Sequence, residues 1–168
     1  MKIRIKVPKR YRLKLIFLAR LTVLGIIFQI VWRLNPNFSL LKLIVAYAVA
    51  FLTASQVVSD LSGIFVVKDN FSLLVVTDCT GWKELFVFFS LLISWPKEKD
   101  WKRAAISAAG IFLFNIFRLS YLVVFNQGFD YFHPAFQLFA IFVILAFWLW
   151  SINVKKRVRR KKRKKRGR

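Results

Sequence analysis

Few side chains in this sequence can do nucleophilic chemistry, because it holds one cysteine and one histidine among 168 residues. The cysteine stands in Asp78-Cys79-Thr80-Gly81-Trp82, directly before an apolar run that we expect to be helical. A thiol at the N-terminus of a helix lies at the positive end of the helix dipole, which favours the thiolate. We therefore predict that Cys79 is a nucleophile with a lowered pKa. Thr80 or Gly81 would be the cap of the following helix, and Gly81 would also allow close approach of a ligand.

Three other polar residues stand out in the sequence. Arg118 and Asn115 lie inside an expected apolar helix, and His133 lies at the expected start of another. Arg118 ends an Asn-x-x-Arg segment inside a long apolar run, and Asn115 lies one helical turn before it on the same face. Placing an arginine inside a membrane helix costs at least a few kcal/mol of free energy. The default hypothesis for such a residue is therefore a functional role. His133 comes just before Pro134, at the start of the last apolar run.

A thiol, an imidazole and a guanidinium are the parts that acyl transfer needs. The Cys79 thiolate would attack a peptide carbonyl, and the His133 imidazole would protonate the leaving amine and later activate the acceptor. The Arg118 guanidinium would stabilise the oxyanion. Each residue also has an ordinary structural interpretation, as a small buried hydrophobe, a polar anchor at the interface and a snorkelling cation, respectively. On that interpretation the chain is a non-catalytic small polytopic membrane protein, such as an assembly or transport subunit.

Five apolar runs must position these side chains, and 58% of the sequence is hydrophobic. A membrane span needs about 20 residues, which the third run reaches only if it begins near Cys79 or lies in a thinned bilayer. We therefore predict an all-α polytopic membrane protein, with a bundle of four to five transmembrane helices. The runs are residues 15–32, 40–58, 82–95, 104–125 and 132–152.

A short β-hairpin is predicted before the third run. Residues 64–67 and 71–77 are rich in β-branched and aromatic side chains, and Lys68-Asp69-Asn70 between them is a turn signal. An open hairpin cannot lie in lipid, because the backbone groups at its edges would be unsatisfied. We therefore expect residues 60–78 in water or at the level of the headgroups.

The charges predict an orientation. The formal net charge is +22, and 19 of the 29 Lys and Arg lie in residues 1–14 and 155–168. Basic segments stay on the cytoplasmic side, so we expect the C-terminus and the loop 96–103 inside, and the hairpin, Cys79 and His133 on the extracytoplasmic side of the plasma membrane. The predicted domains are a basic segment 1–14, a membrane domain 15–153 and a basic cytoplasmic tail 154–168. No nucleic-acid partner is expected, because no folded soluble domain is left to present the tail.

The first run conflicts with this orientation. Five full spans with the C-terminus inside would place the seven cations of residues 1–14 outside. Either residues 15–32 do not span the membrane fully, with Arg20 snorkelling at the interface, or the charge rule is overridden. We favour the incomplete first helix. With a single cysteine and a single histidine, no cluster of zinc-site spacing can form, and we expect no metal and no cofactor.

The cysteine and histidine motifs together resemble a known family. The order of Cys-Thr-Gly at residues 79–81, Asn-x-x-Arg and a histidine at the outer start of the next helix is similar to that of the exosortase/archaeosortase family, over residues 60–153. The resemblance implies a membrane-embedded cysteine transpeptidase. Its substrates would be exported proteins with a C-terminal sorting signal, made of a short motif, a transmembrane helix and a basic cluster. It would pass the cleaved protein to a membrane lipid or another acceptor.

The resemblance also implies roles for single residues. Cys79 would be the nucleophile, His133 the general acid/base and Arg118 the group that stabilises the oxyanion or orients the substrate. Thr80, Gly81 and Asn115 would bind substrate or support the site. Hydrolysis without transfer would use the same residues.

The chain departs from the family pattern in two respects. It is shorter than the longer members, so we expect a partner or a second copy of the chain to supply a missing wall around the substrate. Lys83 and Glu84 are charged where a plain apolar helix is expected, and the sequence assigns them no role.

Overall fold

The computed structural model describes residues 9–34, 36–125 and 129–152 of the chain. Helices dominate this part of the chain, and a small three-stranded antiparallel sheet lies between the second and third helices in the sequence. The predicted tail 154–168 lies outside the described residues, and the first helix begins inside the predicted basic segment 1–14. The helices are α1 (Lys9–Arg33), α2 (Ser39–Thr53), α3 (Trp82–Ser94), α4 (Trp101–Val124) and α5 (Phe129–Ile152), with a 3-10 turn, η1 (Thr77–Thr80), before α3.

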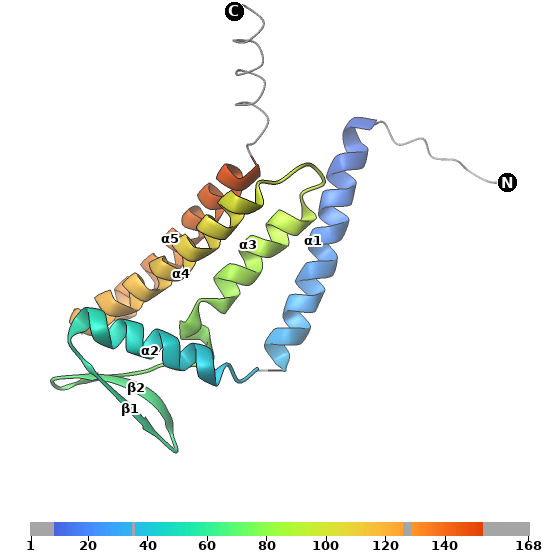
Figure 1. Cartoon of the computed structure of the whole chain (residues 1–168). Helices are drawn as coiled ribbons and strands as arrows, with labels where there is room; N and C mark the ends of the chain where they lie inside the picture. Colours follow the sequence, from blue (N-terminus) through green and yellow to red (C-terminus); the bar gives the residue numbers. More distant parts are fainter. Residues whose placement is uncertain (1–8, 35, 126–128, 153–168) are drawn as a thin grey trace, which may run out of the picture.

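In the described chain α1, α3, α4 and α5 lie side by side, and α2 crosses one end of this group (Figure 1). α3 packs against α1, α4 and α5, and α4 packs along α5. α2 contacts α4, the sheet and η1. The start of α1, the α3–α4 connection and the end of α5 all lie at the end opposite to the sheet (Figure 1). Both ends of the described chain therefore lie on the same side of the helix group.

Among the described residues, three helices are long and apolar enough to cross a membrane. The matching segments are Tyr11–Arg33 in α1, Trp101–Val124 in α4 and Pro134–Ile152 in α5. α2 has 15 residues and is thus about 22 Å long, which is less than the roughly 30 Å thickness of a bilayer core. α3 has 13 residues. The predicted helical architecture is confirmed, and length and composition support three of the predicted four to five spans.

The first two apolar runs differ from their predictions. α1 is continuous over 25 residues, Arg20 included, so its length allows a complete span, against our preference for an incomplete first helix. α2 ends at Thr53, where Ala54 adopts a left-handed conformation with φ 52°. The prediction that this helix runs to Val58 was wrong, because the chain enters a strand at Gln56.

The predicted hairpin is present as β2 (Gly63–Lys68) and β3 (Phe71–Leu74), in which Lys68 pairs with Phe71. A further strand, β1 (Gln56–Asp60), pairs with the other edge of β2. β1 was not predicted from the sequence, because Val57 and Val58 were assigned to the end of the apolar run of α2, across Ser55 and Gln56. The sheet is therefore larger than predicted, in the order β1-β2-β3.

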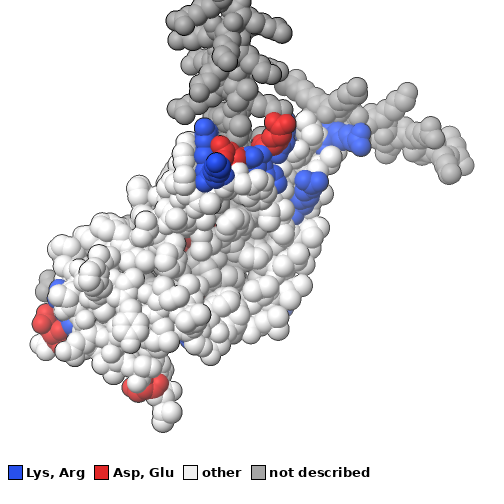
Figure 2. Space-filling model, in the orientation of Figure 1, with Lys and Arg blue, Asp and Glu red and all other residues white. Residues whose placement is uncertain are grey.

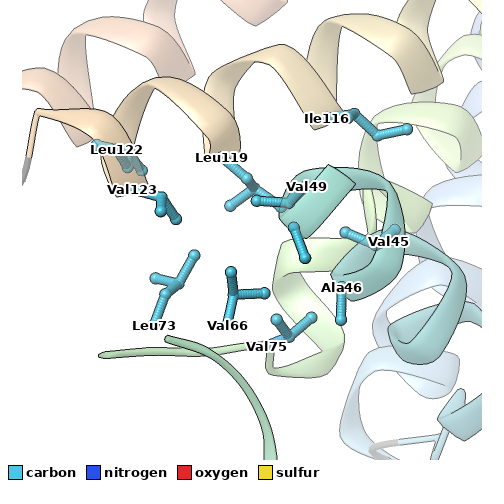
Figure 3. Packing of buried hydrophobic residues seen from close by; sticks show 11 residues of the cluster. Val45, Ala46, Val49, Val66, Leu73, Val75, Ile116, Leu119, Leu122 and Val123 are labelled. Carbon is cyan, nitrogen blue, oxygen red and sulfur yellow. The ribbon is translucent and has the colours of Figure 1, made fainter. Parts of the chain in front are cut away.

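Two buried clusters hold these layers together, and α4 contributes to both. The first cluster joins the sheet and α2 to the second half of α4, and Figure 3 shows its side chains from β2 and β3 facing those of the two helices. The second cluster lies between α3, α4 and α5 and includes Phe88, Ile111 and Ile144. The inner face of α4 is thus fixed between the sheet layer and the other helices. The labelled side chains of the first cluster are Val45, Ala46, Val49, Val66, Leu73, Val75, Ile116, Leu119, Leu122 and Val123.

Basic side chains gather at one end of the molecule (Figure 2). This is the end where α1 starts and where the α3–α4 connection lies. The connection and the first turn of α4 hold Lys97, Lys99, Lys102 and Arg103. The helix group therefore has one basic end, with the sheet and η1 at the other.

Gly110 of α4 tests the packing of α4 against α5, and Gly25 of α1 serves as its control. A Cβ at Gly110 would lie 2.7 Å from the Phe147 ring, whereas a Cβ at Gly25 would meet nothing within 4 Å. We expect Gly110→Ala to lower the free energy of unfolding by about 1–3 kcal/mol through overpacking. Gly25→Ala should be neutral or stabilising by about 0.5–1 kcal/mol, because alanine favours the helix. Thermal unfolding of both variants in the same detergent measures this, and equal midpoints would contradict the described packing.

Candidate functional site

Cys79 lies in η1, the turn between β3 and α3. Its N–H donates to the Val76 carbonyl over 2.9 Å, which closes the turn directly after the strand. The half-buried Sγ lies 4.0 Å from the Leu74 carbonyl oxygen and packs against the first buried cluster. Gly81 then adopts a left-handed φ of 75° and directs the chain into α3. The thiol is thus held at the end of a strand and before the start of a helix.

Asn115 of α4 connects this turn to the helix group through a hydrogen bond. Its Nδ2 donates to the Cys79 carbonyl oxygen over 2.7 Å, and the side chain is buried. A Cβ at Gly81 would lie 3.1 Å from three atoms of the Asn115 side chain. Glycine is therefore required at this position both for its backbone conformation and for the close approach of α4. The structure brings Cys79, Gly81 and Asn115 together, and Asn115 and Gly81 support the turn.

Thr80 stabilises the turn internally. Its hydroxyl donates to the Thr77 carbonyl oxygen over 2.7 Å and is fully buried. The hydroxyl does not cap α3, whose N-cap position is Gly81 without a side-chain hydrogen bond. Of the two residues expected as the cap, the structure therefore places Gly81 at the N-cap, and Thr80 supports the turn before it.

Arg118 lies one turn after Asn115 on the inner face of α4. Only 3% of the residue is exposed, and its Nη1 lies 3.3 Å from Oε1 of Glu84 on α3. Arg118 Nε, Glu84 Oε2 and Asn115 Oδ1 are buried, and none of them has a hydrogen-bond partner in the part of the chain that the structure describes. Unsatisfied buried polar atoms are uncommon and call for an explanation, such as a ligand that they would bind.

Glu84 is the residue of this site that the sequence analysis missed. A signal for it was present, because a buried arginine in a membrane helix needs a counter-charge or a polar partner. Glu84 is an acidic residue of the first turn of α3, directly after the cysteine motif. What the sequence alone could not provide was the register of α3 against α4.

Lys83, the other unassigned charge, belongs to the surface of the site. It forms an ion pair with Asp78 at 2.6 Å, and its Nζ lies 4.3 Å from the centre of the Trp32 ring. Exposed ion pairs contribute little to stability. The cation–π contact joins α1 to the start of α3.

The pKa of Cys79 is shifted in the direction opposite to our expectation. Burial raises the pKa of the thiol, a hydrogen bond with the Val76 backbone and the positive charge of Arg118 oppose this, and Asp78 and Glu84 add to it. The prediction of a pKa lowered by the helix dipole was wrong, because desolvation of the thiolate outweighs the favourable interactions. At rest near neutral pH the sulfur is therefore a protonated thiol.

His133 lies in the first turns of α5, and its side chain is outside the described part of the structure. The turns around it are placed by aromatic contacts, because the Phe132 and Phe136 rings pack against Tyr121 at centroid distances of 5.4 and 5.3 Å. Tyr121 lies one turn after Arg118 on α4. The backbone thus brings the start of α5 close to the turn of α4 that follows Arg118.

A cavity of about 370 Å³ opens beside η1. Thr77 and Asp78 of η1 line it together with Trp32 of α1 and Lys42 of α2. A volume of this order suits part of a ligand or a short peptide segment. The described residues contain no group of three or more His, Cys, Asp or Glu that could hold a metal ion.

The raised pKa of Cys79 predicts a slow reaction with alkylating reagents at neutral pH. Only the thiolate reacts, so the alkylation rate should rise at a higher pH than for the same cysteine in the unfolded chain. Arg118→Gln removes a charge that lowers the pKa and should move the midpoint further up. Mass spectrometry of iodoacetamide adducts across a pH series measures the midpoints. A wild-type midpoint at or below that of the unfolded chain would contradict the described environment of the thiol.

The family model of the transmembrane exosortases matches residues 5–156. The match therefore includes α1 and α2 as well as the region of the cysteine, arginine and histidine motifs. Comparisons with curated proteins and with solved structures find no match.

Proposed function

Because this chain belongs to the transmembrane exosortase family, we propose that it is a membrane-embedded cysteine transpeptidase. It cleaves exported proteins at a C-terminal sorting signal and transfers them to a lipid or another acceptor. The observation that carries the proposal is the 2.7 Å hydrogen bond from Asn115 to the Cys79 carbonyl. This bond joins the cysteine turn to the face of α4 that also holds Arg118.

The first half of the reaction forms a thioester. The Cys79 sulfur attacks the scissile carbonyl carbon and gives a tetrahedral intermediate, whose oxyanion is stabilised by the Arg118 guanidinium. The C–N bond then breaks, and the leaving amine takes a proton from the His133 imidazole. Because burial raises the pKa of Cys79, a base must remove the thiol proton as the sulfur attacks. We assign this step to His133.

The second half returns the enzyme to its starting state. An acceptor nucleophile, deprotonated by His133, attacks the thioester carbonyl, and the C–S bond breaks. Transfer to an amine or hydroxyl gives a modified product, whereas attack by water gives hydrolysis. The half-buried position of Cys79 limits the access of water to the thioester and so favours transfer over hydrolysis.

We place the active site on the extracytoplasmic side and the C-terminus in the cytoplasm. Basic side chains lie at the end of the helix group that holds the α3–α4 connection (Figure 2). The sheet, which leads through η1 into α3, lies at the other end (Figure 1). If α1 crosses the membrane and α2 lies along its surface, both basic ends of the chain lie together on the cytoplasmic side. This arrangement removes the conflict over the N-terminus.

The proposal is tested by coexpressing the protein with an exported substrate that carries a C-terminal signal, and by following its processing on immunoblots. Cys79→Ala should abolish processing, because no other thiol is available. His133→Ala should reduce the rate about 100-fold or more, the usual contribution of a general acid/base. Lys97→Gln, at the basic end of the molecule, is the control and should leave processing unchanged.

Unchanged processing by Cys79→Ala would overturn the proposal and favour a non-catalytic role. Mass spectrometry of the new C-terminus separates the two outcomes of the second half-reaction. A mass increased by an acceptor indicates transfer, and a free carboxylate indicates hydrolysis.

A further inference from the structure

Glu84 has no role in the mechanism above, although it lies in the first turn of the helix that follows Cys79 and contacts Arg118. We propose that Glu84 is a positioning residue, which holds the Arg118 guanidinium against the Cys79 turn so that it meets the developing oxyanion. This inference rests on the proposed function. It starts from the 3.3 Å contact between Arg118 Nη1 and Glu84 Oε1, in which the two side chains are 4% and 18% exposed.

The position of Glu84 in the chain supports this role. Glu84 lies in the first turn of α3, a helix that begins at Trp82 shortly after the turn that holds Cys79. The same short segment therefore presents the nucleophile and the partner of the arginine. A displacement of α3 would move both together, so the distance between the sulfur and the guanidinium is maintained by α3 and not by α4 alone.

The ion pair also prevents Arg118 from leaving the site. A long arginine side chain in a membrane helix moves toward the headgroups unless a partner retains it. Glu84 is the acidic partner of Arg118 among the described residues. Without it, a buried guanidinium has to find water or another acceptor.

The contact leaves the Nε–H donor of Arg118 free of the ion pair. It uses one nitrogen of Arg118 and one oxygen of Glu84, and Arg118 Nε is buried without a partner among the described residues. A two-point contact would occupy the edge of the guanidinium, whereas this one leaves the Nε–H donor available. Donors that are held in place before the reaction stabilise an oxyanion better than mobile ones.

The charges around the Cys79 thiol allow its pKa to distinguish two roles of Glu84. Glu84 could hold the Arg118 side chain in place, or it could only neutralise the charge of Arg118. Among the described residues, Arg118 of α4 lowers the pKa of Cys79, and Asp78 of η1 and Glu84 of α3 raise it. α2 also packs against η1, and its one charged residue, Lys42, is not among the groups that shift this pKa. The effect of Arg118 is larger than that of Glu84. The two interpretations therefore predict opposite shifts when Glu84 is removed.

If Glu84 holds Arg118, its loss removes both charges from the thiol, and the alkylation midpoint rises. If Glu84 only neutralises an Arg118 that stays in place, the midpoint falls, because the negative charge alone is lost. The experiment compares Glu84→Leu in the wild-type chain and in the Arg118→Gln chain by alkylation across a pH series. Glu84→Gln keeps the shape and one oxygen acceptor and serves as the milder variant if the leucine variant does not fold.

We expect Glu84→Leu to raise the midpoint in the wild-type chain and to lower it in the Arg118→Gln chain. Processing of the substrate should fall about 10- to 100-fold, as for a misplaced catalytic group. Asp100→Asn is the matched control, because it removes the charge of the Asp100–Arg103 pair at the other end of α4 and can still cap the helix. It should leave both readouts unchanged.

A midpoint that falls in both chains, or processing within twofold of wild type, would overturn the positioning role. The alkylation assay needs no substrate, so it also separates this inference from the proposed function. If the wild-type protein processes no substrate while the midpoint still shifts in opposite directions in the two chains, the transpeptidase proposal fails and the positioning of Arg118 by Glu84 is supported.

Discussion

A guanidinium inside an apolar helix needs polar partners, because an unpaired charge in hydrocarbon surroundings is costly. Arg118 meets this requirement by facing α3, where Glu84 contacts it at 3.3 Å. Asn115, one turn earlier, holds the Cys79 carbonyl at 2.7 Å. The contact between Arg118 and Glu84 sets the register of α3 against α4, and the hydrogen bond from Asn115 places the cysteine turn. The geometry of the site therefore follows from the partners that these two polar residues of α4 find.

The rest of the fold keeps that face of α4 in place. The sheet and α2 pack on its second half, and α3 and α5 pack on its first half and middle. The same packing half-buries Cys79 and raises its pKa, so the thiol is held in an unreactive form until a base acts on it. The packing that buries the Cys79 thiol thus does not activate it. In this account, activation depends on a base from another helix, His133 of α5.

Much of the site could be predicted from sequence, because rare polar residues in apolar runs have few explanations. Cys79, Asn115 and Arg118 were singled out in this way, and the structure joins Asn115 to the cysteine turn. The hairpin followed from its β-branched pattern. β1 was missed because apolar content alone does not separate a strand from the end of a helix. Glu84 was missed because its partner lies on another helix. The thiol pKa was predicted with the wrong sign, because a local dipole argument contains no desolvation.

The central claim is that Cys79 attacks the substrate and carries it as a thioester. The most direct test uses His133→Ala, in which the thioester should form slowly and persist, with intact-mass analysis of the protein after incubation with substrate. The account predicts an adduct of the enzyme with the N-terminal part of the substrate, released by hydroxylamine and located on Cys79. The absence of any adduct under conditions where substrate is cleaved, or an adduct on another residue, would contradict it.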